Sequence, residues 1–190
     1  MAEVKVLIEG YTNADSVGES GEERTATTIT LVRDGNWVIV TDPGVLESQD
    51  ILVAALAKEG LQVADVNLVF VTHSHLDHYR NVGMFAEAKN LEYWAIWDGN
   101  KADDWEEQFT NDVKIIKTPG HNYDGLTMLA KTKDGVVAIA GDLWWKENYP
   151  DATNDPYASD QKKLAESRQK VLALADYIIP GHGPMFKVEK

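Results

Sequence analysis

The stretch "VTHSHLDHYR" at residues 71–80 decides how this sequence is interpreted, because it packs three histidines and an aspartate into six positions. The whole chain has only five histidines. The stretch follows "VNLVFV" at residues 66–71, an almost wholly apolar run that is typical of a strand buried on both faces. We therefore expect four polar side chains to leave the end of one buried strand: His73, His75, Asp77 and His78.

The spacing of these side chains indicates metal binding. His73 and His75 are two residues apart, so in an extended chain both point to the same side and can reach one ion. Asp77 and His78 follow the turn and are better placed to serve a second ion. One zinc ion takes about three or four protein ligands, so two ions need further ligands from elsewhere in the chain.

The two remaining histidines and one more aspartate can supply those ligands. His121 lies in "TPGHNYD" and His182 in "IPGHGP", each directly after a Pro-Gly turn at the end of a predicted strand. Asp142, in "IAGDLWW", offers a carboxylate that can bridge two cations. The predicted ligand set is His73, His75, Asp77, His78, His121, Asp142 and His182.

The rest of the chain predicts a mixture of strands and helices. Apolar runs between turn signals predict strands at residues 4–12, 26–35, 36–44, 66–71, 91–97, 113–118, 126–132, 135–141 and from 177. The Asp-Gly pairs at 34–35 and 134–135 predict two hairpins. Helices are expected at 48–59 with Gly60 as its stop, at 79–88, and at about 160–175 with Ser159 as its cap.

Composition limits the class of protein. A chain of 190 residues with 44% hydrophobic content predicts one globular domain over residues 1–190. The absence of cysteine excludes disulfides and thiolate ligands. Without a secretory signal or a membrane-length apolar run, a cytoplasmic protein with no membrane partner is expected. The net charge of −13 disfavours long nucleic acids, so a small-molecule substrate is expected, and the oligomeric state stays open.

Four short motifs together resemble those of the metallo-β-lactamase fold superfamily: "THSHLDH" (72–78), "TPGH" (118–121), "GD" (141–142) and "PGHG" (180–183). The first is also the metal-binding pattern of glyoxalase II. In addition, "TDPG" (41–44) resembles the first motif of the family, whose aspartate, here Asp42, supports the ligands from behind. The resemblance implies a four-layer αβ/βα sandwich, in which two β-sheets lie face to face, helices lie outside, and a dinuclear site lies at one edge.

The same resemblance divides the ligands between two ions. It implies that His73, His75 and His121 hold the first ion. It implies that the second is held by Asp77, His78 and His182. Asp142 would bridge the two ions. Imidazole and carboxylate suit zinc, which we expect here, and also iron and manganese.

The resemblance also implies a hydrolase. Coordination to a metal lowers the pKa of water from about 15.7 to near 7. A hydroxide that bridges the ions would then attack an ester, thioester, lactone or phosphotriester, with Asp77 accepting a hydrogen bond from it. Five neighbours of the ligands are candidate substrate contacts: Tyr79, Asn122, Tyr123, Trp144 and Trp145.

Other functions stay open at this point. They are a nuclease or phosphodiesterase of the same fold, an iron-containing redox enzyme or dioxygenase, and a metal-stabilised binding module. The best-known zinc β-lactamases use a cysteine near the position of Asp142, so β-lactam hydrolysis is not expected as the main activity. A complete ligand set argues against a binding module, because a purely structural site needs no open coordination position.

Overall fold

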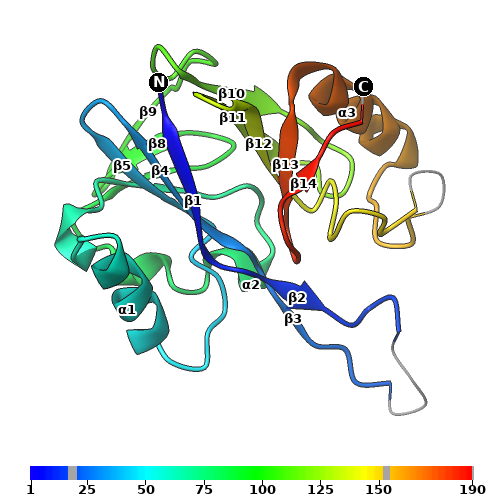
Figure 1. Ribbon diagram of the computed structural model, residues 1–190, viewed down its shortest axis with the longest axis horizontal. Helices are drawn as coiled ribbons and strands as arrows, with labels where there is room; N and C mark the ends of the chain where they lie inside the picture. Colours follow the sequence, from blue (N-terminus) through cyan, green and yellow to red (C-terminus); the bar gives the residue numbers. More distant parts are fainter. Residues whose placement is uncertain (17–20, 152–154, 190) are drawn as a thin grey trace.

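The computed structural model describes residues 1–16, 21–151 and 155–189 (Figure 1). Two β-sheets make up most of it. The first sheet holds, in spatial order, β1 (Glu3–Ile8), β4 (Ile29–Asp34), β5 (Trp37–Thr41), β6 (Leu68–Phe70), β7 (Lys89–Leu91), β8 (Ile96–Asp98) and β9 (Lys101–Asp103). The second sheet holds β10 (Val113–Lys117), β11 (Leu126–Thr132), β12 (Gly135–Gly141), β13 (Tyr177–Pro180) and β14 (Phe186–Lys187).

The remaining elements lie around these sheets. A short hairpin, β2 (Tyr11–Thr12) and β3 (Thr25–Ala26), extends away from them (Figure 1). The helices are α1 (Asp50–Lys58), α2 (Leu76–Tyr79) and α3 (Gln161–Leu174), with the 3-10 turns η1 (Val63–Asp65) and η2 (Val82–Met84). None of the described helices is long and apolar enough to cross a membrane.

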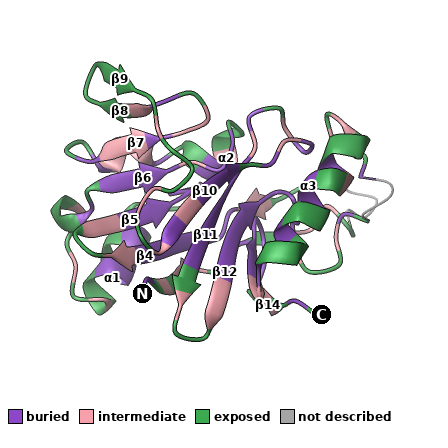
Figure 2. Cartoon of the chain, turned by 90° about the horizontal axis from the view of Figure 1, so that it is seen from above, coloured by how far each residue is buried: buried purple, intermediate pink, exposed green. Residues whose placement is uncertain are grey.

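Apolar side chains fill three layers, because successive residues of a strand point to opposite faces of its sheet. In β6, Leu68 and Phe70 pack between the two sheets, whereas Val69 packs under α1. In β10, Ile115 faces the first sheet and Ile116 faces α3. Helices α1 and α3 therefore cover the outer faces of the two sheets (Figure 2). This arrangement confirms the predicted four-layer αβ/βα sandwich.

Several local predictions are confirmed. The Asp-Gly pairs form the β4–β5 and β11–β12 hairpins, and Gly35 adopts the positive φ of 57° that such a turn requires. Strand β6 is fully buried, and α1 ends before Gly60, which has a φ of 72°.

Two predictions of helix and strand are wrong. Residues 79–88 do not form a helix, because α2 lies earlier and the chain then turns so that the Asn81 side chain donates to Gly44 O at 2.8 Å. The predicted strand 91–97 is instead the β7–β8 hairpin. Its turn is held by the Glu92 carboxylate, which accepts from the backbone N–H groups of Trp94 and Ala95 at 3.0 and 3.1 Å.

Three further boundaries differ. The predicted strands 4–12 and 26–35 are each interrupted, since Gly10 N–H donates to Thr28 Oγ1 at 3.1 Å in place of a strand partner. The cap of α3 is Asp160 rather than Ser159. Asp160 Oδ1 accepts from Lys163 N–H at 3.0 Å, while the Ser159 hydroxyl donates to Gly120 O.

The Asp160 cap gives a stability prediction. Asp160→Ala removes the acceptor for a helix N–H, and we expect a loss of about 1 kcal/mol. For a chain of this size the melting temperature should fall by roughly 2–4 °C in a calorimetric scan. Asp160→Asn keeps an acceptor oxygen and should unfold close to the wild type, so an equal loss in both variants would contradict the capping role.

Candidate metal centre

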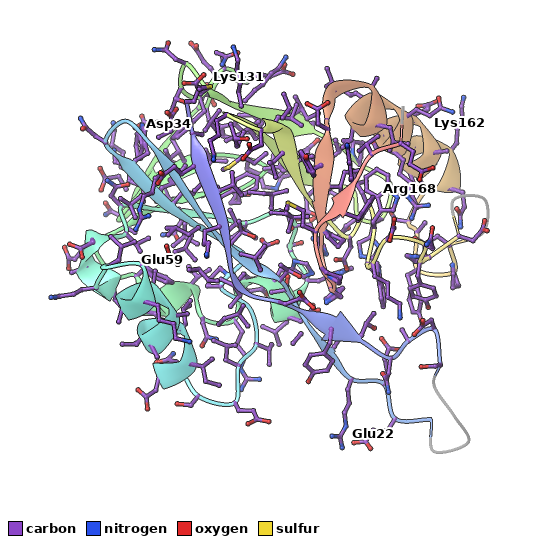
Figure 3. The ribbon with its side chains drawn as sticks, in the orientation of Figure 1. Glu22, Asp34, Glu59, Lys131, Lys162 and Arg168 are labelled. Carbon is purple, nitrogen blue, oxygen red and sulfur yellow. The ribbon has the colours of Figure 1, made fainter. Side chains whose placement is uncertain are left out.

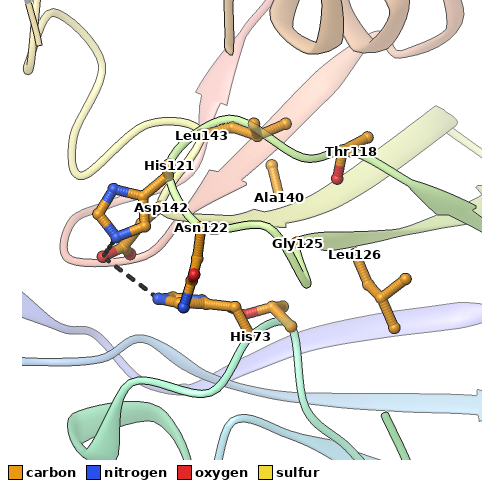
Figure 4. Close-up of a pocket in the computed structure, with 10 residues that line it drawn as sticks. His73, Thr118, His121, Asn122, Gly125, Leu126, Ala140, Asp142 and Leu143 are labelled. Carbon is orange, nitrogen blue, oxygen red and sulfur yellow. Dashed lines mark hydrogen bonds and ion pairs between the residues drawn. The ribbon is translucent and has the colours of Figure 1, made fainter. Parts of the chain in front are cut away.

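The predicted ligands converge because several strands end at one edge of the sandwich. Strand β6 runs parallel to β5, and β12 runs parallel to β13, so their carboxyl ends lie at the same edge within each sheet. The turn 73–78 follows a strand of the first sheet, whereas strands of the second sheet are followed by His121, Asp142 and His182. Figure 4 shows His73 from the first sheet facing His121 and Asp142 from the second.

The first group consists of His73, His75, His121 and one oxygen of Asp142. His75 Nδ1 lies 3.0 Å from His73 Nε2 and 3.1 Å from His121 Nε2. Asp142 Oδ2 lies 3.8 Å and 3.4 Å from the same two Nε2 atoms. Four potential ligand atoms thus face one point, at separations that suit the coordination shell of a single ion.

The second group consists of Asp77, His78 and His182. Asp77 Oδ2 lies 3.9 Å from His78 Nε2 and 3.7 Å from His182 Nε2. Asp142 Oδ1 lies 3.2 Å from both of these nitrogen atoms. Asp142 Oδ2 also lies 3.2 Å from His182 Nε2. The Asp142 carboxylate therefore lies between the two groups and contacts both, which is the position of a bridging ligand.

Contacts behind the ligands fix the orientation of the rings. Asp42 Oδ2 lies 2.9 Å from His78 Nδ1 and accepts from the Thr72 hydroxyl at 2.7 Å. Because that hydroxyl gives its proton to Asp42, it accepts from His73 Nδ1 at 3.1 Å. In the neutral rings of His73 and His78 the proton therefore sits on Nδ1, and Nε2 keeps the lone pair that binds a metal.

Burial and neighbouring charges set the pKa values in the site. Burial lowers the pKa of His73 well below its usual value and that of His121 to about 4. Burial also opposes the charged forms of His78 and His182, but Asp142, together with Asp42 at His78 and the Ala26 carbonyl at His182, raises the pKa of both rings. Burial tends to raise the pKa of the Asp142 carboxyl, yet His182 and His78 together lower it well below the usual range.

The residues present fit divalent metal ions. Within the described part of the chain, His78 Nε2 and Asp142 Oδ1 are buried and make no hydrogen bond. Such orphaned atoms are rare in folded proteins and need a partner. A donor set of imidazole nitrogen and carboxylate oxygen suits zinc, iron or manganese.

Comparison with known proteins identifies the family. A family model described as "Metallo-beta-lactamase superfamily" matches residues 23–109. The Xenopus laevis protein "Metallo-beta-lactamase domain-containing protein 1" is 33% identical over 196 residues, which cover 98% of this chain and 82% of that protein. The chain belongs to the metallo-β-lactamase superfamily.

One further relative and one solved structure are similar to most of this chain. A candidate metallo-hydrolase from Methanocaldococcus jannaschii is 28% identical over 156 residues, or 80% of this chain and 74% of that protein. A crystal structure of a candidate metallo-beta-lactamase from Thermotoga maritima aligns with a TM-score of 0.74 and 24% identity. That alignment covers 98% of this chain and 99% of the other, so the whole sandwich is shared.

The predicted substrate contacts of this metallo-β-lactamase superfamily member fall in different places. Tyr79 and Tyr123 are exposed near the ligand turns, and Asn122 lines a small cavity with His73, His121 and Asp142 (Figure 4). The Trp145 ring lies 6.0 Å from the His121 ring and 5.4 Å from the His182 ring, between centroids.

Trp144, by contrast, is placed in the apolar core. Its side chain is buried in the apolar layer under α3, with its ring 6.3 Å from that of Phe186 and 5.6 Å from the Arg168 guanidinium. Arg168 itself is buried between α3 and the loop after Asp142, whereas Lys162 on the same helix is exposed (Figure 3). Packing therefore accounts for Trp144.

The structure also brings in residues that the sequence did not single out. Asp124 is buried, and its Oδ2 accepts from Ser74 N–H at 3.0 Å, between His73 and His75. Thr25 and Thr27 place hydroxyls against ligand histidines. Asp124 lies three residues after His121, so its closeness to a predicted ligand could have indicated it. The two threonines contact histidines more than 50 residues away in the chain, and no local pattern indicates these contacts.

Proposed function

We propose that this chain is a dinuclear metal-dependent hydrolase that cleaves small ester-like substrates. One observation carries the proposal: the buried Asp142 carboxylate lies between the two groups, with Oδ1 facing His78 and His182, and Oδ2 facing His73, His121 and His182. A single buried carboxylate between two histidine groups supports two adjacent cations rather than one. The net charge of −13 supports a small-molecule substrate over a long nucleic acid.

Each side chain has a role in this proposal. One ion would be held by His73, His75 and His121. The other ion would be held by Asp77, His78 and His182. Asp142 would bind both ions. When bound, divalent ions supply Lewis-acid chemistry, which lowers the pKa of water to about 7 and stabilises negative charge that develops on a substrate oxygen.

The exposed side of the site gives the direction of substrate binding. His75 is exposed, whereas the other four histidines are buried. Asp77 is partly exposed, and one of its oxygens faces His78 and His182. We assign to the other Asp77 oxygen the acceptance of a proton from the attacking water, because it is the carboxylate of the site that solvent can reach.

Metal removal tests the proposal. Dialysis against a chelator should abolish hydrolysis, and readdition of zinc, manganese or ferrous ion should restore it. A ligand at 1,000 times its Kd contributes about 4 kcal/mol, so the metal-free protein should melt roughly 8–16 °C lower. The measurement is a screen of ester, thioester, lactone and phosphotriester substrates, run beside calorimetry on protein of known metal content.

The outcomes of this screen separate the candidate functions. Full activity in chelated protein, or in a His73→Ala, Asp142→Ala double variant, would contradict a metal-dependent hydrolase. Turnover of short RNA or cyclic nucleotides alone would favour a phosphodiesterase. Oxygen uptake by the iron-loaded protein without hydrolysis would favour a redox enzyme.

A further inference from the structure

Two threonine hydroxyls from one short segment reach ligand histidines of the second group. Thr25 Oγ1 lies 2.9 Å from His182 Nδ1, and Thr27 Oγ1 lies 3.2 Å from His78 Nδ1. Thr27 is buried, and Thr25 is half-buried at the base of the β2–β3 hairpin. The first group has no such contact from this segment among the described residues.

The proton positions at His182 follow from its partners. His182 Nδ1 lies 3.0 Å from the Ala26 carbonyl oxygen, which can only accept a hydrogen bond. Nδ1 of the neutral ring must therefore carry the proton. Thr25 Oγ1, at 2.9 Å from the same nitrogen, is placed to accept a share of it. Nε2 lies 3.2 Å from both oxygens of Asp142 and would give its lone pair to an ion bound there.

The proton positions at His78 follow in the same way. The Thr27 hydroxyl has one proton and donates it to Gly181 O at 3.1 Å. Its lone pairs therefore face His78 Nδ1, where Asp42 Oδ2 also accepts. Thr27 thus joins the turn that holds His78 to the loop that holds His182, because Gly181 is the residue before His182.

We propose that Thr25 and Thr27 are positioning residues that hold His182 and His78 with Nε2 toward the metal, and so set the affinity of the second group. This inference rests on the proposed dinuclear function. Hydrogen bonds behind a ligand histidine fix its tautomer and orientation, and losing one commonly costs 10–100-fold in metal affinity. Because both hydroxyls act on the second group alone, their loss should leave the first ion in place.

Isosteric variants test this without changing shape. Thr25→Val and Thr27→Val each replace a hydroxyl by a methyl group, whereas Thr25→Ser and Thr27→Ser keep the hydroxyl. On dialysis of zinc-loaded protein against a graded chelator, the valine variants should lose the second equivalent about 10- to 100-fold more readily and keep the first. The serine variants should retain both equivalents as the wild type does.

A matched control separates positioning from stability. Thr28 lies in the same segment and is buried, but its hydroxyl donates to Gly183 O at 3.0 Å and contacts no ligand histidine. Thr28→Val should lower the melting temperature without a selective loss of the second ion. An equal selective loss in Thr28→Val, or unchanged zinc binding in both other valine variants, would overturn the proposal.

A second readout needs no metal. In the metal-free protein, at a pH high enough for both rings to be neutral, ¹⁵N correlation spectra of the imidazoles should show His78 and His182 protonated at Nδ1. Thr25→Val should broaden or mix the tautomers of His182, and Thr27→Val those of His78. Unchanged tautomers would overturn the inference. A wild-type chain that binds fewer than two ions would instead contradict the proposed function, and the tautomers would still decide the role of the threonines.

Discussion

Asp142→Asn is expected to lower hydrolytic activity by at least about 10³-fold. The substitution keeps the shape of the side chain but removes the negative charge that faces both histidine groups. A metal ion provides several kcal/mol of stabilisation to the reaction, and each 1.36 kcal/mol is a factor of ten in rate. We expect metal content to fall as well, since one carboxylate serves both groups.

The measurement is kcat/KM on the best substrate of the screen, together with elemental analysis of the same sample. Asp134→Asn, in the exposed β11–β12 turn, is the control and should keep both activity and metal. Circular dichroism separates a folded variant from a misfolded one. A folded Asp142→Asn protein with full metal content and full activity would contradict the bridging role.

Gly181→Ala should impair the site without altering any ligand. A Cβ atom at Gly181 would lie 1.9 Å from Asp142 Oδ1, so one of the two must move. The Gly181 backbone is held on both sides: its N–H donates to Trp144 O at 2.8 Å, and its carbonyl accepts from Thr28 N–H at 2.6 Å. The carboxylate is therefore the group that yields.

We expect this displacement to cost about 10²-fold in activity, because a 1 Å shift of a site group can cost that much. Overpacking should also lower stability by roughly 1–3 kcal/mol. Steady-state kinetics and chelator titration measure the first effect, and denaturant unfolding the second. Gly83→Ala is the control, since no atom lies within 4 Å of its added Cβ. Normal metal retention in Gly181→Ala would show that Asp142 has room to move.

The sequence predicts most of the sandwich where local pattern and tertiary environment agree. Strand β6 is apolar on both faces because it lies between α1 and the second sheet, and the Asp-Gly turns need no tertiary help. The prediction fails at the β7–β8 turn, where Glu92 holds the backbone through its side chain. An apolar run such as 91–97 gives no sign of that turn.

In the candidate site too, the sequence predicts some features and misses those that depend on tertiary contacts. The seven predicted ligand residues come together in the structure because each follows the end of a strand or its turn. The contacts behind them could not be predicted, because they join distant parts of the chain. Thr25 and His182 are 157 residues apart, and the sequence around either residue does not indicate that the two are in contact.

The division of the ligands between the two sheets has a consequence for the resistance of the protein to degradation. His73, His75, Asp77 and His78 leave the first sheet, and His121, Asp142 and His182 leave the second. Neither half of the chain alone carries a complete set, so bound ions would tie the halves together and oppose their separation. Bound metal would then lower the fraction of molecules in which the two sheets have separated. A protease would therefore cleave the metal-free protein faster than the metal-bound protein.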